Sequence, residues 1–204
     1  MKQFSALVNI LGTSTKTNDK LNALSEYFAN ANDKDKVWVI ALFSGRRPKR
    51  AVNSTKLQDW CIELSDLPRW LFEESYHTVG DLAETIALLL PENISSQHTN
   101  PLHYYLEKLI AIEKEDEQIK KKFIQDCWME MNAEERFVFN KLITGGFRIG
   151  VSQQTIVNAL AKVTKLSSSV IAHRISGNWD PVSISFEELM SENSSSIDHS
   201  KPYP

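Results

Sequence analysis

Apolar residues recur along this chain at the three- and four-residue spacing of an α-helix, in short runs that stop at prolines, glycines or capping residues. Phe4, Leu7 and Leu11, for example, would share one helical face. No stretch sustains the alternation of apolar and polar residues that marks a half-buried β-strand. With 204 residues, of which 42% are hydrophobic and 24% charged, the chain can bury an ordinary globular core. We therefore predict an all-α fold of many short helices.

Capping residues predict where several of these helices begin. Asn132, with Glu135 three residues later, is the pattern of a capping box. Asp81 would cap a helix that Pro91 ends, because proline cannot continue an α-helix. The remaining candidate caps are the side chains of Asn18, Asp33 or Asp35, Ser54, Ser152, Ser167 and Ser185.

Polar segments suggest how the chain is divided. Residues 92–100 are polar and lack apolar periodicity. They are the best candidate for a boundary between two helical subdomains within one domain, residues 1–190. Residues 191–204 are rich in serine and broken by two prolines, and such a segment cannot bury enough apolar surface to fold alone. We expect it to be a linker.

The net charge of −3 argues against a nucleic-acid partner until the charges are placed along the chain. Ser44–Gln58 contains five Lys and Arg residues and Arg136–Trp179 contains six, and neither window contains an acid. All 26 Asp and Glu residues therefore lie in the rest of the chain. Such segregation can produce one electropositive face on an acidic body. It could also be a chance distribution over solvated helix faces.

The first window contains a basic loop. Gly45 can close the preceding apolar helix, and Pro48 would hold the following turn extended. We predict that the loop contacts phosphates, because an arginine offers a planar fork of donors. The alternative is a solvated loop paired with acidic surface. The residues concerned are Arg46, Arg47, Lys49 and Arg50.

The second window contains a glycine-rich turn between two helices. Glycines allow positive φ and leave no side chain between the backbone and an approaching group. A helix that begins after the turn would direct unpaired N–H groups outward. Together with an arginine, these features would suit a bound phosphate. The alternative is an ordinary helix C-cap beside one exposed arginine. The predicted contacts are Thr144, Gly145, Gly146, Arg148, Gly150 and Ser152.

Arg174, near the end of the second window, could contact phosphate as well or form a structural ion pair. No catalytic or metal-binding constellation accompanies these features, since the five histidines lack metal-ligand spacing and no P-loop is present. Cys61 and Cys127 stand among apolar helical positions, so we expect buried thiols in a reducing compartment. We expect neither a signal peptide nor a membrane span.

Several blocks of the sequence, in order, resemble the DNA-binding domain of ATP-dependent DNA ligases. They are Leu42–Arg50, Trp70–Tyr76, Val79–Thr85, Gly145–Gly150 with Ala159–Ala161, and His173–Trp179. The resemblance covers about residues 4–189 and is to bacterial ligases that carry this domain ahead of their catalytic core. It implies a multi-helix ligase DNA-binding-domain fold. Such a domain grips the minor groove on both sides of a nick through phosphates.

The same resemblance implies which functions this chain lacks. ATP-dependent ligases attach AMP to the lysine of a Lys-x-Asp-Gly motif, and this sequence has no Asp-Gly pair. We therefore expect the nucleotidyltransferase and OB-fold domains elsewhere in the same polypeptide, and the present chain to be inactive alone. No cofactor is expected in this segment, whereas the parent enzyme would use ATP and Mg²⁺. The expected setting is a monomer on nicked double-stranded DNA in the cytoplasm, at the bacterial nucleoid, during repair, replication or recombination.

Two other classes of function fit the residues. The chain could be a helical scaffold that binds an acidic protein through Ser44–Gln58, or a helix-turn-helix regulator that reads a DNA sequence. A salt titration separates DNA from a protein partner, and competition with randomised DNA separates the regulator, because phosphate contacts carry no sequence information.

Overall fold

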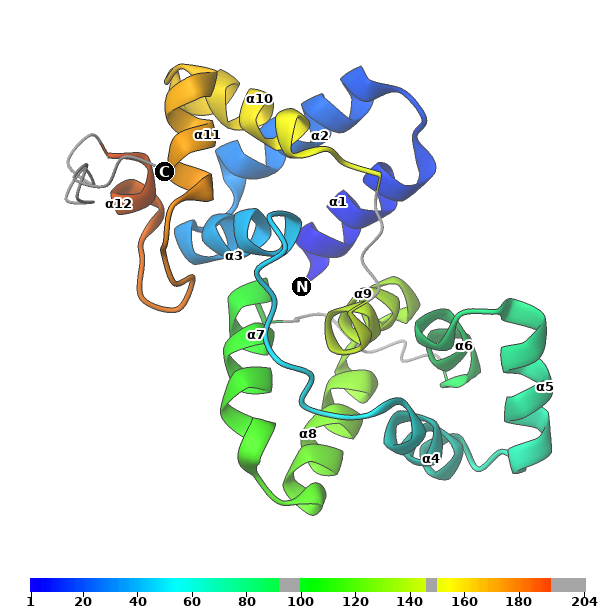
Figure 1. Cartoon of the computed structure of the whole chain (residues 1–204). Coiled ribbons are helices and arrows are strands. Elements are labelled where there is room, and N and C mark those ends of the chain that lie inside the picture. The colour runs from blue at the N-terminus through cyan, green and yellow to red at the C-terminus, as the bar shows by residue number, and fades with distance from the viewer. Residues whose placement is uncertain (92–99, 146–149, 192–204) are drawn as a thin grey trace, which may run out of the picture. The chain divides into compact units, whose positions relative to one another are not determined.

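The computed structural model describes residues 1–91, 100–145 and 150–191 (Figure 1). All secondary structure in this described part of the chain is helical, which confirms the predicted all-α fold. The chain divides into two compact units, each built from two separate stretches of sequence. Unit 1 combines Met1–Thr15 with Arg47–Gly150, and unit 2 combines Lys16–Arg46 with the chain from Val151 onward.

Each unit is a cluster of short helices. The helices of unit 1 are α1 (Lys2–Thr13), α4 (Ser54–Ser65), α5 (Arg69–Val79), α6 (Leu82–Leu89), α7 (Leu102–Ala111) with a 3₁₀ turn at Ile112–Lys114, α8 (Glu117–Glu130) and α9 (Ala133–Thr144). Those of unit 2 are α2 (Thr17–Asn30), α3 (Asp33–Phe43), α10 (Gln153–Thr164), α11 (Ser168–Ser176) and α12 (Phe186–Met190).

Helix α9 is the centre of unit 1, with α6 packed along it and α1 against it. The fully buried Asn140 side chain of α9 accepts a hydrogen bond from Trp128 Nε1 (2.7 Å) on α8 and donates one to the Ala83 carbonyl (3.2 Å) on α6. The Tyr105 and Phe139 rings meet edge to face, with centroids 5.7 Å apart. Because a buried amide must find partners, these bonds fix how α6 and α8 lie on α9.

Arg136 of α9 is also part of this core and does not belong to the basic surface that the charge pattern suggested. Its side chain is buried, and Nε donates to the Trp128 carbonyl at 2.5 Å. Nη1 donates to the carbonyls of Leu90 (3.3 Å) and Pro91 (2.8 Å), beyond the end of α6. A charge that acts on helix-end carbonyls inside the core adds nothing to the outer face.

The predicted subdomain boundary near 92–100 does not separate the two units. The helices on both sides of that segment belong to unit 1, where α6 and α9 share one core. Polarity identified a segment between helices, but tertiary contacts decide which helices pack together. Residues 92–99, and the predicted linker 191–204 except for Ser191, lie outside the described residues.

Unit 2 is built around α10, and every residue of α3 from 37 to 42 is buried. Helix α2 lies along α10, and α11 packs on α10. The short helix α12 contacts α3, where Lys36 Nζ lies 5.0 Å from the centroid of the Phe186 ring. Two of the helices that contact α3, α10 and α12, lie after residue 151 in the sequence.

Most of the predicted helix starts are observed. The side chains of Asp81, Asn132, Ser152, Ser167 and Ser185 each accept a hydrogen bond from a backbone N–H of the first turn. Asn132 and Glu135 form the predicted capping box. Three other predictions were wrong by a few positions: Asn32 caps α3, Asn53 caps α4, and Asn18 lies inside α2.

Both cysteines are free and buried, as predicted. Burial raises the pKa of the Cys61 thiol to about 12, so this thiol stays protonated at neutral pH and is a poor nucleophile. No helix in the described ranges is both long and apolar enough to cross a membrane.

Candidate nucleic-acid interface

The basic loop and the glycine-rich turn, which are almost a hundred residues apart in sequence, meet within unit 1. Helix α9 ends at Thr144, and its C-cap Gly145 has a φ of +81°, the left-handed conformation that glycine adopts without strain. The Arg50 guanidinium donates to the Thr144 carbonyl at 3.0 Å, and Arg47 donates to the Gly145 carbonyl. Two of the predicted arginines therefore lie against the end of α9.

The chemistry of a helix end explains this arrangement. The last carbonyls of an α-helix lack intrahelical partners and carry the negative end of the helix dipole, so cations are stabilised there. Arg47 and Arg50 are both exposed to solvent. Because a guanidinium has five N–H donors in a fixed fork, Arg50 can hold the helix end and still present donors to a second anion.

Gly145, the first residue of the turn, contributes clearance and no free backbone donor. The Gly145 N–H already donates a hydrogen bond to the Lys141 carbonyl at 2.9 Å. A Cβ placed on Gly145 would stand 3.7 Å from Arg47 Nη1, so the arginine lies directly over the bare backbone. Gly150 also has positive φ, at +58°. Gly146 and Arg148, predicted as the central contacts of the turn, lie outside the described residues.

The two hydroxyl groups predicted to assist are used inside their own helices. Thr144 Oγ1 donates to the Asn140 carbonyl at 2.9 Å. Ser152, in unit 2, caps α10 by accepting from the Thr155 N–H at 3.2 Å. Lys49 is exposed, which suits a phosphate contact. DNA contact by these residues stays a prediction, and the geometry favours Lys49 over the hydroxyls.

Arg46 and Arg174 have structural partners within unit 2. Arg46 Nη1 donates to the Ile175 carbonyl at 2.8 Å and Nη2 donates to the Gly177 carbonyl, while the guanidinium carbon lies 4.3 Å from the centroid of the Trp179 ring. Arg174 donates to the Met190 carbonyl at the end of α12. Both arginines therefore have structural contacts. For Arg174 the sequence had left a structural ion pair open, and the partner observed is a backbone carbonyl.

The sequence reasoning missed the role of Trp179. A tryptophan face is the strongest aromatic partner for a guanidinium, and the Trp179 indole N–H donates to the Ile175 carbonyl at 3.0 Å. No local pattern connects Arg46 to this ring, because 129 residues separate Arg46 from Ile175.

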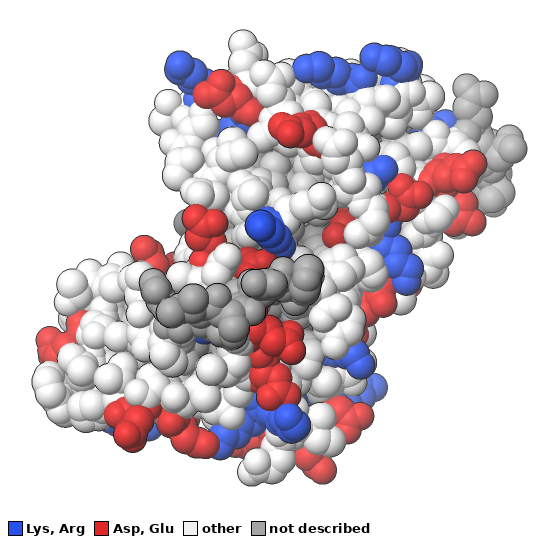
Figure 2. Space-filling view, turned by 180° about the vertical axis from the view of Figure 1, so that it is seen from behind, with Lys and Arg blue, Asp and Glu red and all other residues white. Residues whose placement is uncertain are grey.

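Acidic partners further reduce the positive surface. Lys141 pairs with Asp81, and Lys56 pairs with Glu117 at 2.7 Å. Burial alone would raise the pKa of the Asp81 carboxyl, but hydrogen bonds from Lys141 and the Glu84 N–H lower that pKa on balance. Basic and acidic side chains are interspersed on the face shown in Figure 2. The favourable features for phosphate are therefore local ones, at Arg47, Lys49, Arg50 and the end of α9.

A model of the protein family described as "DNA ligase N terminus" matches residues 1–161. This chain belongs to that family. The matched range includes the basic loop, the glycine-rich turn and most of α10, and it ends before Arg174. A search of curated protein sequences gave no match. Family membership gives the chain a role associated with DNA ligase and agrees with the all-α fold.

Proposed function

We propose that this chain binds double-stranded DNA around nicks, without sequence preference, as the DNA-binding domain of an ATP-dependent ligase. The observation that carries the proposal is the meeting of Arg47 and Arg50 with the carboxyl end of α9. Those contacts hold two guanidinium groups in place on one surface before any ligand arrives. Preorganised donors lose less conformational entropy on binding than free side chains do.

The chemistry at this surface fits phosphate better than bases. Arginine forks match phosphate oxygens, and lysine supplies a point charge without directional demands. Contacts of this kind fix position and carry no sequence information, which suits a protein that must act at any nick. The first contacts would come from Arg47, Lys49 and Arg50, and Arg148 stays a predicted contact.

The catalytic steps would belong to other domains of the same polypeptide. Adenylation would need the Lys-x-Asp-Gly lysine, ATP and Mg²⁺, and the sequence has no Asp-Gly pair. Incubation of this chain with labelled ATP and Mg²⁺ should leave no covalent AMP on the protein. The proposed setting is DNA repair, replication or recombination in the cytoplasm, at the nucleoid.

Fluorescence anisotropy on two unrelated nicked duplexes tests the proposal. Four to six phosphate contacts would give a slope of roughly −4 to −5 for log affinity against log salt. Equal affinity for both sequences is expected. Salt-independent binding would favour the protein-scaffold alternative, and strong preference for one sequence would favour a helix-turn-helix regulator.

A matched pair of variants locates the contact. Arg50→Ala should weaken DNA binding, whereas Arg69→Ala should not. Arg69 is an exposed arginine of the same unit, held by Asp59 at 2.5 Å on a different helix. If the two variants lose affinity equally, the basic loop is not the contact surface.

A further inference from the structure

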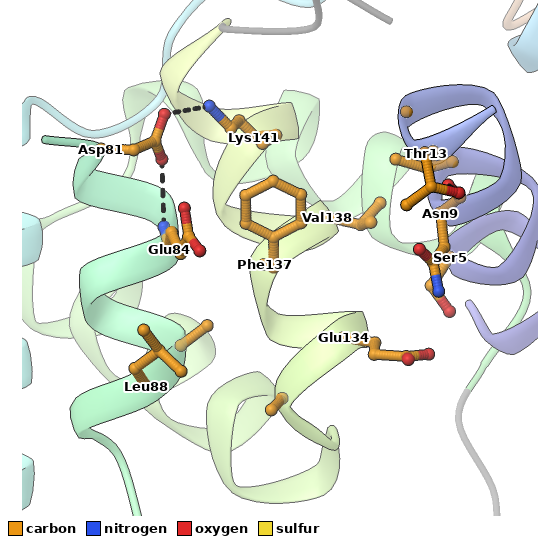
Figure 3. Close-up of a pocket in the computed structure, with 14 residues that line it drawn as sticks. Ser5, Asn9, Thr13, Asp81, Glu84, Leu88, Glu134, Phe137, Val138 and Lys141 are labelled. Carbon is orange, nitrogen blue, oxygen red and sulfur yellow. Dashed lines mark hydrogen bonds and ion pairs between the residues drawn. The ribbon is translucent and has the colours of Figure 1, made fainter. Parts of the chain in front are cut away.

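Unit 1 has a groove of about 750 Å³ that the proposed DNA contacts do not use (Figure 3). Its floor is a stripe of α9, and its walls are stripes of α1 and α6. The lining residues used below are Gly12 on α1, Glu84 and Leu88 on α6, and Glu134 and Phe137 on α9. The groove lies wholly within one compact unit.

The spacing of the lining residues shows that the groove follows the helix axes. On α9 it is lined at positions 133, 134, 137, 138 and 141, and on α1 at positions 5, 8, 9, 12 and 13. Residues three and four apart share one face of a helix, and two turns are about 11 Å long. The groove is therefore a straight trough about two helical turns long. Its width is the space between α1 and α6, which lie on either side of α9.

Apolar side chains line this trough, and Phe137 on its floor is half-buried. Leu88 on the α6 wall is 63% exposed. Figure 3 shows Phe137 projecting between the two walls. Gly12 on the opposite wall has no atom within 4 Å of the position its Cβ would occupy. An open apolar trough between helices is the shape that an amphipathic helix fills with residues at i, i+3, i+4 and i+7.

The charges of the rim define the occupant. Asp81 and Lys141 at one end neutralise each other as an ion pair. Glu84 and Glu134 are both exposed, and neither carboxylate has a cationic partner among the described residues. The rim therefore carries a net charge of about −2, counted from these four groups at neutral pH. Complementary charge on a partner would steer association and fix its register.

We propose that this groove binds an amphipathic helix of a partner protein, in which lysine or arginine residues flank an apolar stripe. The apolar stripe covers Phe137 and Leu88, and the basic residues meet Glu84 and Glu134. The bound helix completes a four-helix cluster with α1, α6 and α9. This interaction is separate from DNA binding, because none of these residues belongs to the basic loop or the glycine-rich turn.

A pair of labelled peptides tests the proposal against the full chain. Both are about 14 residues long and carry leucines at one helical face. One has lysines beside the leucine stripe and its twin has glutamates. In fluorescence anisotropy the lysine peptide should bind at least tenfold more tightly than the glutamate twin. Equal affinity, or no binding of the lysine peptide, overturns the proposal.

Gly12→Leu blocks the groove without removing a native contact. Leucine favours a helix more than glycine does, so the melting temperature should not fall. Lysine-peptide affinity should drop at least tenfold, while DNA affinity stays at the parent value. Unchanged peptide affinity in a protein that melts normally overturns the proposal, and leaves the proposed DNA binding intact.

Charge reversal provides the second test. The double variant Glu84→Lys with Glu134→Lys should prefer the glutamate peptide. The matched control, Glu73→Lys with Glu74→Lys on the exposed face of α5, should retain the parent's preference. If the control changes preference as the groove variant does, net charge and not the groove decides binding. A dimer that Gly12→Leu converts to a monomer in light scattering assigns the groove to a second copy and also overturns the proposal.

Discussion

Arg46 and Arg47 are neighbours in the sequence and are chemically identical, yet they belong to different units. Arg46 is half-buried, donates to two carbonyls at the carboxyl end of α11 and stacks on Trp179. Arg47 is exposed and lies over the end of α9. A run of basic residues therefore does not behave as one surface. What each arginine does depends on which helix end it reaches, and the chain changes units between these two positions.

Arg136 is more deeply buried than Arg46 or Arg47, and its substitution should have the largest effect on stability. Arg136→Ala removes the hydrogen bonds that the guanidinium donates to the Trp128 and Leu90 carbonyls inside the core, and it opens a cavity. We expect a loss of about 3 to 5 kcal/mol in the free energy of unfolding. Urea denaturation measures it. A loss below about 1 kcal/mol would contradict the anchoring role assigned to this residue.

Arg46→Ala should destabilise the protein by about 2 to 3 kcal/mol, because two hydrogen bonds to carbonyls and one cation–π contact disappear. DNA affinity, measured where the variant is fully folded, should change less than threefold. Arg46→Lys is the informative companion, since lysine keeps the charge but cannot form the fork to two carbonyls. If Arg46→Ala melts normally and loses DNA affinity, Arg46 is a phosphate contact and the comparison fails.

Arg47→Ala and Arg50→Ala should give the opposite result. Each should cost about 1 to 2 kcal/mol in DNA affinity, as expected for a lost charge-assisted hydrogen bond. Their exposed positions should limit the loss in folding stability to well under that of Arg46→Ala. Thermal melts and anisotropy on the same preparations separate the two effects. Large destabilisation with unchanged DNA binding would assign these arginines to capping α9 alone.

Lys49→Ala should have the smallest effect. Loss of one phosphate contact reduces the magnitude of the salt slope by about 0.9 and weakens binding to all sequences alike. Stability should be unchanged, because the side chain is exposed. The slope from a salt titration is the measurement, with Lys114→Ala, an exposed lysine of the same unit, as control. An equal change in slope for both variants would show that the loop has no special position.

The fold class and most helix starts could be predicted because they depend on residues close in sequence. The capping box of Asn132 and Glu135 needs only three residues of separation, and it was confirmed. Ser54 and Asp33 were predicted as caps, but in each case the residue before it is also a good capping residue. In the structure that earlier residue, Asn53 or Asn32, is the cap. Capping preferences do not decide which of two adjacent polar residues begins a helix.

The candidate site could be predicted only in part, for the opposite reason. Sequence reasoning identified the basic loop and the glycine-rich turn, and unit 1 brings Arg47 and Arg50 to Gly145 and Thr144. It could not separate Arg46 and Arg136 from them, since their partners include backbone carbonyls 129 and 45 residues away in the sequence. Every backbone carbonyl is a potential acceptor, so no residue pattern marks these particular ones.

The interleaved course of the chain has a consequence for synthesis. Helices α2 and α3 emerge from the ribosome before most of unit 1, yet their partner α10 is made more than a hundred residues later. Domains generally fold as units during synthesis, and contacts this distant in sequence slow folding. Unit 1 can therefore fold once Gly150 has emerged. The apolar residues of α3 are buried only after the rest of unit 2 has been made. A chain stopped at Gly150 should expose those residues and aggregate.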